Sequence, residues 1–210
     1  MWALVTDGTI TKYFSYPKGF TLGDNQYPAD IFMKWSVEEK EAIGIYEVVF
    51  DNSNFKDEKW YINTNQSYAF ADGTVTASYG TATPKAHADS LWTQQDSDDG
   101  DLPDDKEVGD VKVEGLKTQL IRTIKQQASG LLAPTDWYVV KSTEVADYDI
   151  PANILSFRAD VRSKSNEMET QIDNCTTVDE LKTLYEYVNT GTESDPVITR
   201  PLAEFPTLEN

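Results

Sequence analysis

The sequence has very little cysteine and histidine, with one of each in 210 residues. A single cysteine, Cys175, cannot form an intramolecular disulfide, and with His87 alone beside it the chain has no His/Cys cluster for a transition metal. His87 stands in PKAHADS, outside any recognisable nucleophile motif, and no G-x-S-x-G occurs. We therefore expect no Ser/His/Asp or Cys/His hydrolase. Cys175 is expected to pack at a helix end, and His87 to be solvated.

Basic charge is also scarce, since 18 lysines and arginines face 36 acidic residues, for a net charge of −18 and a pI of about 4.3. No run of basic residues is present. Phosphate contacts require such a run or patch, and an anionic membrane surface would repel this chain. We expect neither nucleic acid nor membrane as a partner. No window approaches the roughly 18 to 20 apolar residues of a membrane span, and no basic region followed by an apolar stretch indicates a signal peptide.

Glycine-rich phosphate loops are absent as well, because neither G-x-x-x-x-G-K-[ST] nor G-x-G-x-x-G occurs. Nucleotide and dinucleotide chemistry thus have no support. Paired carboxylates for glycoside hydrolysis carry no signal, since acidic residues occur throughout the chain. The sequence indicates a protein that is not an enzyme and holds no cofactor, with calcium as the one possibility considered below.

Aromatic residues are plentiful but unevenly placed, with 16 of the 24 in the first 80 residues. This composition, with threonine and valine between the aromatics, favours strands. Asp7-Gly8 and Asp72-Gly73 supply the positive φ angles of tight hairpin turns, so two hairpins are expected. Packing in a core is the favoured role of these aromatics; the alternative is a stacking platform for sugars.

A short helix is expected between the two hairpins. Ser36 and Glu39 have capping-box spacing, and Gly44 takes the place of a C-terminal cap. Residues 45–50 and 59–64 are expected to be further strands. Together these features predict a small β-rich N-terminal domain over residues 1–92.

Residues 93–114 are strongly acidic, with nine acidic residues and two lysines, a net charge of −7. Such a stretch has almost nothing apolar to bury and is expected to be a mobile linker or exposed loop.

This acidic stretch also contains a partial calcium-loop pattern. Four carboxylates fall at positions 1, 3, 9 and 12 of a helix-loop-helix calcium site: Asp96, Asp98, Asp104 and Glu107. The pattern then fails, because Gly100 stands at a ligand position, Asp101 at the place of the turn glycine, and Pro103 has no evident helix before it. A hydrated acidic linker is the alternative.

The helical period takes over beyond this stretch, so residues 115–189 are expected to form a helical domain. The first stripe consists of Leu116, Leu120, Ile124 and Ala128, and Gly130 is expected to end that helix. Residues 131–141, LLAPTDWYVVK, are expected to be a loop with a short extended piece, because the residue before Pro134 is disfavoured in a helix.

Two more helices are expected in this domain. One begins at Pro151 and carries the stripe Ile154, Phe157, Val161, Met168 and Ile172, interrupted at Ser165. The other begins at Thr177, with Glu180 at capping-box distance. Residues 190–210 are expected to be an irregular tail that lies along a surface. The predicted class is α+β, with a β-rich domain, an acidic linker and a three-helix region.

Arg158 and Arg162 lie four residues apart and hence on one helix face, and Asp136 is close enough in the chain to meet them. The pair is either an anion site or an ion pair that fastens the loop to the helix. We favour the ion pair, with Trp137 packed beneath it.

Two segments of the sequence resemble proteins of tailed bacteriophages. The first is the opening WALVTDGTITKYFSYPKGFTLGDNQYPADIFMKWSVEEKEAIGIYEV, which looks like N-terminal modules of small tail and baseplate structural proteins. The second is LLAPTDWYVVKSTEVADYDIPANILSFRADVRSKSNEMETQID, which is similar to a helical module of phage tail-fibre-assembly proteins. The marks of that module here are Thr135, Asp136, Trp137, Pro151, Arg158 and Arg162.

The resemblance implies a non-enzymatic virion structural protein, an adaptor at the tail or baseplate. Such a protein is made in the host cytoplasm and resides in the tail region of the virion. Its partners would be other tail, baseplate or fibre proteins, with copies following the tail symmetry. One alternative is a tail-fibre-assembly chaperone that is absent from the mature particle. The other is a receptor- or glycan-binding accessory protein.

Overall fold

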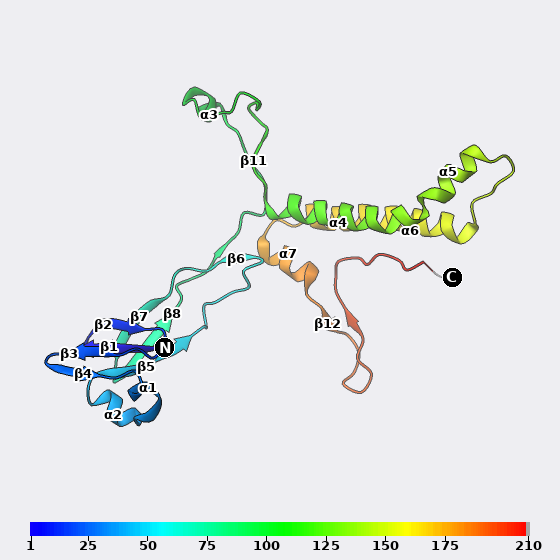
Figure 1. Ribbon diagram of the computed structural model, residues 1–210. Coiled ribbons are helices and arrows are strands. Elements are labelled where there is room, and N and C mark those ends of the chain that lie inside the picture. Colours follow the sequence, from blue (N-terminus) through cyan, green and yellow to red (C-terminus); the bar gives the residue numbers. More distant parts are fainter. Residues whose placement is uncertain (209–210) are drawn as a thin grey trace. The chain divides into compact units, whose positions relative to one another are not determined.

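A computed structural model describes residues 1–208 and shows a mixed α+β protein, 35% helical and 23% strand (Figure 1). The chain divides into two compact units, Met1–Pro84 and Lys85–Asn210. The division therefore falls upstream of the acidic stretch 93–114, which belongs to the second unit. Strands concentrate in unit 1 and helices in unit 2, as the composition predicted. Within the described residues, no helix is long and apolar enough to cross a bilayer.

The elements of unit 1 are β1 Trp2–Thr6, β2 Thr9–Phe14, β3 Phe20–Leu22, β4 Asn25–Tyr27, α1 Ile31–Lys34, α2 Val37–Glu41, β5 Ile45–Asp51, β6 Tyr61–Ile62, β7 Ser67–Ala71, β8 Thr74–Ser78 and β9 Thr83–Pro84. Those of unit 2 are β10 Ser90–Leu91, α3 Gln94–Asp98, β11 Val111–Val113, α4 Leu116–Leu132, the 3-10 turn η1 Ala133–Thr135, α5 Asp136–Glu144, α6 Ala152–Asp173, α7 Val178–Tyr185, β12 Val188–Asn189 and β13 Ile198–Thr199.

Unit 1 is built on a five-stranded sheet in the order β2-β1-β5-β8-β7, in which only β5 and β8 run parallel. Both predicted hairpins are confirmed. Asp7 and Gly8 adopt φ of 51° and 73°, and Asp72 and Gly73 adopt 49° and 73°. These positive angles match the right-handed twist of the flanking strands, which is why Asp-Gly closes both turns.

The two edge strands of the sheet approach each other. The rings of Tyr13 on β2 and Tyr68 on β7 lie 4.7 Å apart. The sheet is therefore strongly curved, and apolar clusters form on both of its faces. One cluster comprises Leu4, Phe14, Phe20, Ile31, Phe32 and Ile45. The other comprises Ala3, Val5, Val48, Val75 and Ala77.

The predicted helix before β5 is confirmed, with its caps. Ser36 Oγ accepts a hydrogen bond from the backbone N–H of Glu39, whose carboxylate accepts one from the N–H of Ser36 (2.8 Å). Gly44 has a φ of 80°, and a Cβ there would lie 2.4 Å from the carbonyl oxygen of Val5. Only glycine permits both the left-handed angle and this approach of the backbone to β1.

The expected strand over residues 59–64 is much shorter, since only Tyr61–Ile62 pairs, with β9. Asn63 explains the difference. Its side chain accepts from the N–H of Lys56 (2.9 Å) and donates to the carbonyl of Lys56 (2.8 Å), which folds the intervening residues into a loop.

Unit 2 is organised by α4 and α6, which run side by side in opposite directions (Figure 1). Asp89 caps α4, because its carboxylate accepts from the N–H of Gly115 (2.6 Å) and the hydroxyl of Thr118 (2.8 Å). The α6 stripe is buried as predicted, including Ser165 at its polar interruption. The third helix is confirmed as α7, with the predicted Thr177–Glu180 capping box.

The predicted end of α4 at Gly130 is wrong. The helix continues to Leu132, and a Cβ at Gly130 would meet nothing within 4 Å. Glycine weakens a helix by only about 1 kcal/mol. Leu131 and Leu132 pack against the cluster formed by Ala128 and residues of α6, and this packing sustains the last turn.

The loop expected over residues 131–141 is also wrong. Pro134 stands in the first turn of η1, where its missing N–H leaves no hydrogen bond unmade, and α5 begins two residues later. This part of the chain is therefore helical almost without interruption from α4 to α5.

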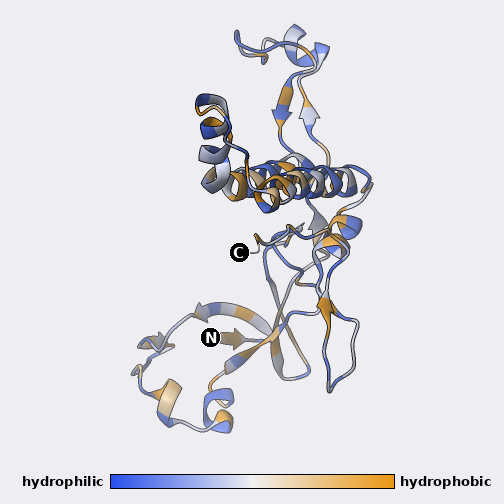
Figure 2. Ribbon diagram, turned by 90° about the vertical axis from the view of Figure 1, so that its right-hand side faces the viewer, coloured by the Kyte–Doolittle hydropathy of each residue, from blue (hydrophilic) through white to orange (hydrophobic). Residues whose placement is uncertain are grey.

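The acidic stretch 93–114 is largely exposed, as expected of an exposed loop, and it is ordered into a hydrogen-bonded hairpin. Trp92 N–H donates to the carbonyl of Asp110, and Gly109 N–H donates to that of Trp92, both at 2.8 Å. Thr93 and Asp96 form a capping box at the start of α3. Figure 2 shows apolar residues on this hairpin and on the β12–β13 hairpin of the C-terminal segment.

We expect Gly44→Ala to destabilise unit 1 by at least ~2 kcal/mol, because it combines a left-handed φ with a clash against backbone. Gly130→Ala is the matched control in unit 2, and it should stabilise α4 by about 0.5–1 kcal/mol. Hydrogen exchange of the β1, β5 and α4 amides in the full chain measures both. A neutral Gly44→Ala would contradict the close approach of Gly44 to β1.

Candidate interaction surface

The junction between α4, α5 and α6 is held by the guanidinium of Arg158, which is 7% exposed. Its Nη1 donates to the carbonyl of Leu132 (3.1 Å) and to Thr135 Oγ1 (2.5 Å), and it lies 2.8 Å from Asp136 Oδ1. Thr135 Oγ1 in turn donates to the carbonyl of Leu132 (2.7 Å). A buried charge is tolerated only when it is well paired, and here three oxygen atoms satisfy it.

The predicted ion pair between Asp136 and Arg158 is therefore present, and it fastens η1 and α5 to α6. Arg162 takes a different place, because its Nη1 donates to the backbone carbonyl of Arg158 (3.3 Å). The structure thus joins one arginine of the predicted pair to Asp136.

Trp137 does not pack beneath the ion pair as expected. It is 51% exposed, with its ring 3.9 Å from that of Tyr138 and near the ammonium of Lys141 (5.6 Å). The cause is the helical conformation of α5, which turns consecutive side chains about 100° apart. Asp136 faces Arg158, and Trp137 is consequently turned away from it.

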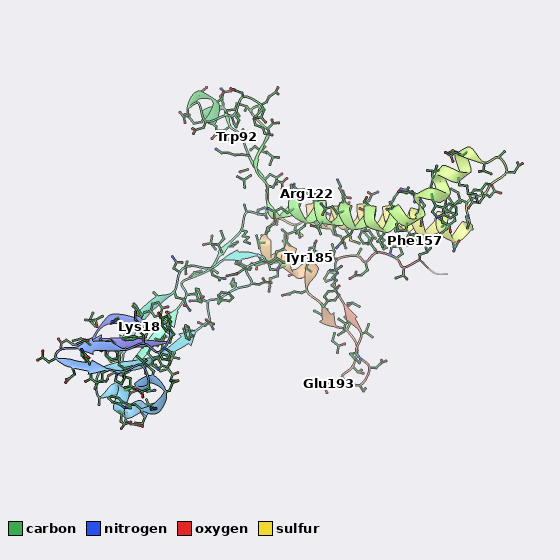
Figure 3. All side chains as sticks on the ribbon, in the orientation of Figure 1. Lys18, Trp92, Arg122, Phe157, Tyr185 and Glu193 are labelled. Atoms are coloured by element: carbon green, nitrogen blue, oxygen red, sulfur yellow. The ribbon has the colours of Figure 1, made fainter. Side chains whose placement is uncertain are left out.

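Phe157 is buried on α6, where it forms a cluster with Ala128 and Val161 (Figure 3). Leu131, Leu132 and Phe205 pack against this cluster. Phe157 therefore anchors the junction from within and takes no part in its exposed surface.

The exposed apolar residues of α5 and its C-terminal end define what we call the α5 surface: Trp137, Val139, Val140 and Val145. α5 has no buried residue, and Val140 is 52% exposed. Isolated helices of nine residues are marginal in water, so the fixed junction at Arg158 must hold α5 in place. Exposed apolar patches mark interaction sites, and tryptophan is enriched among the residues that dominate binding at protein–protein interfaces.

The structure does not bring the four calcium candidates together. Asp96 accepts from the N–H and hydroxyl of Thr93 and pairs with Lys112, while Asp98 accepts from Gln94 Nε2 (2.9 Å). Glu107 lies beyond the helix, where its N–H donates to Asp110 (3.0 Å). Residues 94–98 are helical, and side chains two residues apart on a helix diverge.

Among residues 1–208, no group of three or more histidine, cysteine or acidic side chains is placed to hold a metal ion. Hydrogen bonds from Lys112 and Thr93 lower the pKa of the Asp96 carboxyl from 3.8 to about 2. Lys112 also lies over the ring of Trp92, at 4.4 Å. Figure 3 shows where Trp92 lies on this hairpin. This cation therefore organises the acidic hairpin from within.

The aromatic residues of unit 1 largely pack against one another, which is the role that the sequence analysis favoured for them. Phe14 lies 4.9 Å from Phe20, and Trp2 lies 4.9 Å from Phe32. Tyr16 is an exception, since it is 64% exposed.

Cys175 is buried just after α6, and its thiol donates to the carbonyl of Gln171 (3.4 Å). Burial raises the pKa of this thiol, as expected for a packing residue. His87 is half-buried, and its carbonyl accepts from the N–H of Lys117 (3.0 Å).

Sequence reasoning missed Val139 and Val140, because it placed them in a loop. A usable signal was present, with Asp136 in the first turn and Lys141 near the end of α5, the charge order that favours a helix. Thr135 was noted only as part of a motif, and nothing in the sequence marks it as the acceptor of a buried guanidinium.

Comparisons with protein-family models, with curated protein sequences and with solved structures found no match for this chain.

We expect Arg158→Met to destabilise the α5–α6 junction by about 2–3 kcal/mol, because the charged hydrogen bonds to Leu132 and Thr135 are lost. Asp136→Asn should cost no more than about 1 kcal/mol, since this carboxylate is 59% exposed. Hydrogen exchange of the α5 and α6 amides distinguishes the two. Equal effects would show that the surface pair, and not the buried donor, holds the junction.

Lys112→Met should raise the pKa of Asp96 from about 2 toward 3.8, because the main cause of its depression is removed. In the native chain the ionised carboxylate stabilises the hairpin above pH 3.8, and this contribution is lost as the pH falls through about 2. In Lys112→Met this contribution should be smaller, and its loss should be complete at a higher pH, because the pKa of the folded chain lies closer to 3.8. Carboxyl chemical shifts followed by NMR measure both titrations, and an unchanged pKa would contradict the role of Lys112.

Proposed function

We propose that this chain is a non-enzymatic structural protein of a tailed-phage virion. It acts as an adaptor at the tail or baseplate, to which fibres or neighbouring tail proteins attach. The observation that carries the proposal is the α5 surface, an exposed Trp137 and Val140 on a helix fixed by a buried arginine.

The α5 surface lies within the segment that resembles the helical module of phage tail-fibre-assembly proteins. The marks of that resemblance divide between two tasks in the structure. Thr135, Asp136 and Arg158 build the junction, and Trp137 is exposed on its outside. This division is what an interface module requires, because a rigid support reduces the ordering cost of binding.

The division of the chain into two compact units supports an adaptor. One unit attaches to the virion, and the other engages a fibre or a neighbouring copy. Burial of Trp137 and its valine neighbours supplies the hydrophobic centre of the contact, at about 25 cal/mol per Å² of apolar area. Copies follow the rotational symmetry of the tail.

Mass spectrometry of gradient-purified virions tests the proposal. Peptides of this chain should be present at a ratio similar to those of other tail proteins. A tail-fibre-assembly chaperone, in contrast, is needed for infectious particles but absent from them. Its absence from purified virions would therefore overturn the structural role.

Trp137→Ala tests the α5 surface itself, with Tyr16→Ala as the matched control of similar exposure in unit 1. Supplied in place of the native chain, Trp137→Ala should lower incorporation into virions at least tenfold, because truncating a tryptophan at the centre of an interface costs about 2 kcal/mol or more. Tyr16→Ala should be incorporated normally. If Tyr16→Ala instead abolishes adsorption to host cells while Trp137→Ala has no effect, the receptor- or glycan-binding role replaces the adaptor.

A further inference from the structure

The C-terminal residues 200–208, which we call the strap, supply a missing side of the helical core of unit 2. Leu202 is 1% exposed, and its N–H donates to the carbonyl of Leu184 on α7 (3.0 Å). Phe205 packs against the cluster that contains Phe157. The strap thus contacts α7 through a backbone hydrogen bond and the cluster between α4 and α6 through the side chain of Phe205.

Gln171 on α6 recognises the backbone of the strap on both sides of Leu202. Its Nε2 donates to the carbonyl of Pro201 (3.0 Å), and its Oε1 accepts from the N–H of Ala203 (2.9 Å). One amide therefore satisfies a donor and an acceptor of the strap at once. This arrangement is a built site for an extended peptide, in which one leucine side chain is fully buried.

The strap is connected to α7 by residues 186–199, none of which is buried. This tether folds into the β12–β13 hairpin. The N–H of Thr190 donates to the carbonyl of Val197 (2.8 Å), and the N–H of Thr192 donates to the carbonyl of Asp195 (3.1 Å). Glu193 lies near the tip of the hairpin (Figure 3). An isolated two-stranded hairpin is at best marginally stable, so the tether opens at low free-energy cost.

We propose that the strap exchanges between copies of this chain, so that the strap of one copy occupies the Gln171 and Leu184 site of another. When the hairpin opens, the 14 residues of the tether reach up to roughly 45 Å at about 3.3 Å per residue. Every contact of Leu202, Phe205 and Gln171 is remade in the partner. Closed and exchanged forms then differ mainly in the state of the hairpin, and protein concentration sets the balance.

In the closed form the site is filled by the chain's own strap. The strap of a second copy has the same sequence and therefore fits the same site. Two features favour exchange over permanent closure. Tyr187, Val188, Val197 and Ile198 leave the closed hairpin with exposed apolar side chains that a partner can cover. A pocket of about 440 Å³ also lies between α6 and residues 206–208, so this part of the strap is not closely packed against α6.

The inference stands apart from the proposed function, because purified chain alone tests it. Tagged and untagged copies are mixed at high concentration, incubated, diluted and captured through the tag. Mixed dimers should form, with a dimer fraction that rises with concentration in light scattering after gel filtration. Failure of mixed dimers at all concentrations would overturn the exchange and leave the virion experiment unaffected.

A locked hairpin is the decisive variant. Val188 and Thr199 lie opposite each other in β12–β13, so Val188→Cys with Thr199→Cys should form a disulfide that keeps the tether closed. Cys175 is buried and does not compete. Oxidation should lower capture of untagged copies at least tenfold, and reduction should restore it. Equal capture in the oxidised form would overturn the mechanism.

Leu202→Asp removes the anchor of the strap, and Leu208→Asp is its matched control at an exposed position. Leu202→Asp should abolish mixed dimers, and Leu208→Asp should retain them. Circular dichroism checks that the helices of Leu202→Asp are intact; if they are lost, the locked hairpin decides the question by itself. Mixed dimers with a folded Leu202→Asp would contradict the proposal.

Discussion

The architecture of unit 2 depends on one buried cation. The chain passes from α4 through the 3-10 turn η1 into α5 and returns along α6. From its place on α6, Arg158 binds the end of α4, the η1 turn and the start of α5. A guanidinium suits this buried position because its charge is delocalised and weakly hydrated, whereas a lysine ammonium is a compact, strongly hydrated charge. The stability of the junction and the exposure of α5 are consequently two results of the same contact, since α5 has no core of its own.

Unit 1 depends on backbone conformation more than on charge. Two Asp-Gly turns set the register of its hairpins, and Gly44 lets the chain enter β5 directly against β1. The parallel pairing of β5 with β8 is the long-range feature, and it requires the crossing segment that contains the Asn63 loop. Aromatic packing on the curved sheet then completes the unit.

Sequence reasoning succeeded where the signal involves neighbouring residues. The two Asp-Gly turns and the capping boxes at Ser36 and Thr177 concern atoms within a few residues of one another, and the structure has all of them. The α6 stripe was also predictable, because a period of 3.6 residues persists over its length.

The failures share a dependence on partners distant in the chain. Leu131 and Leu132 extend α4 past Gly130 because residues of α6 pack against them. The acidic stretch forms a hairpin in which Trp92 is hydrogen-bonded to Asp110 and Lys112 pairs with Asp96. The position of the strap likewise depends on a hydrogen bond from Gln171, some 30 residues upstream. None of these pairings leaves a periodic mark. In the candidate site the sequence therefore identified Asp136 and Arg158 but placed Trp137 on the wrong side.

The strap also has a consequence for synthesis: Phe157 leaves the ribosome 48 residues before Phe205, roughly 2–10 s earlier at 5–20 residues per second. During that interval the cluster of Ala128, Phe157 and Val161 lacks the side that Phe205 covers in the folded chain.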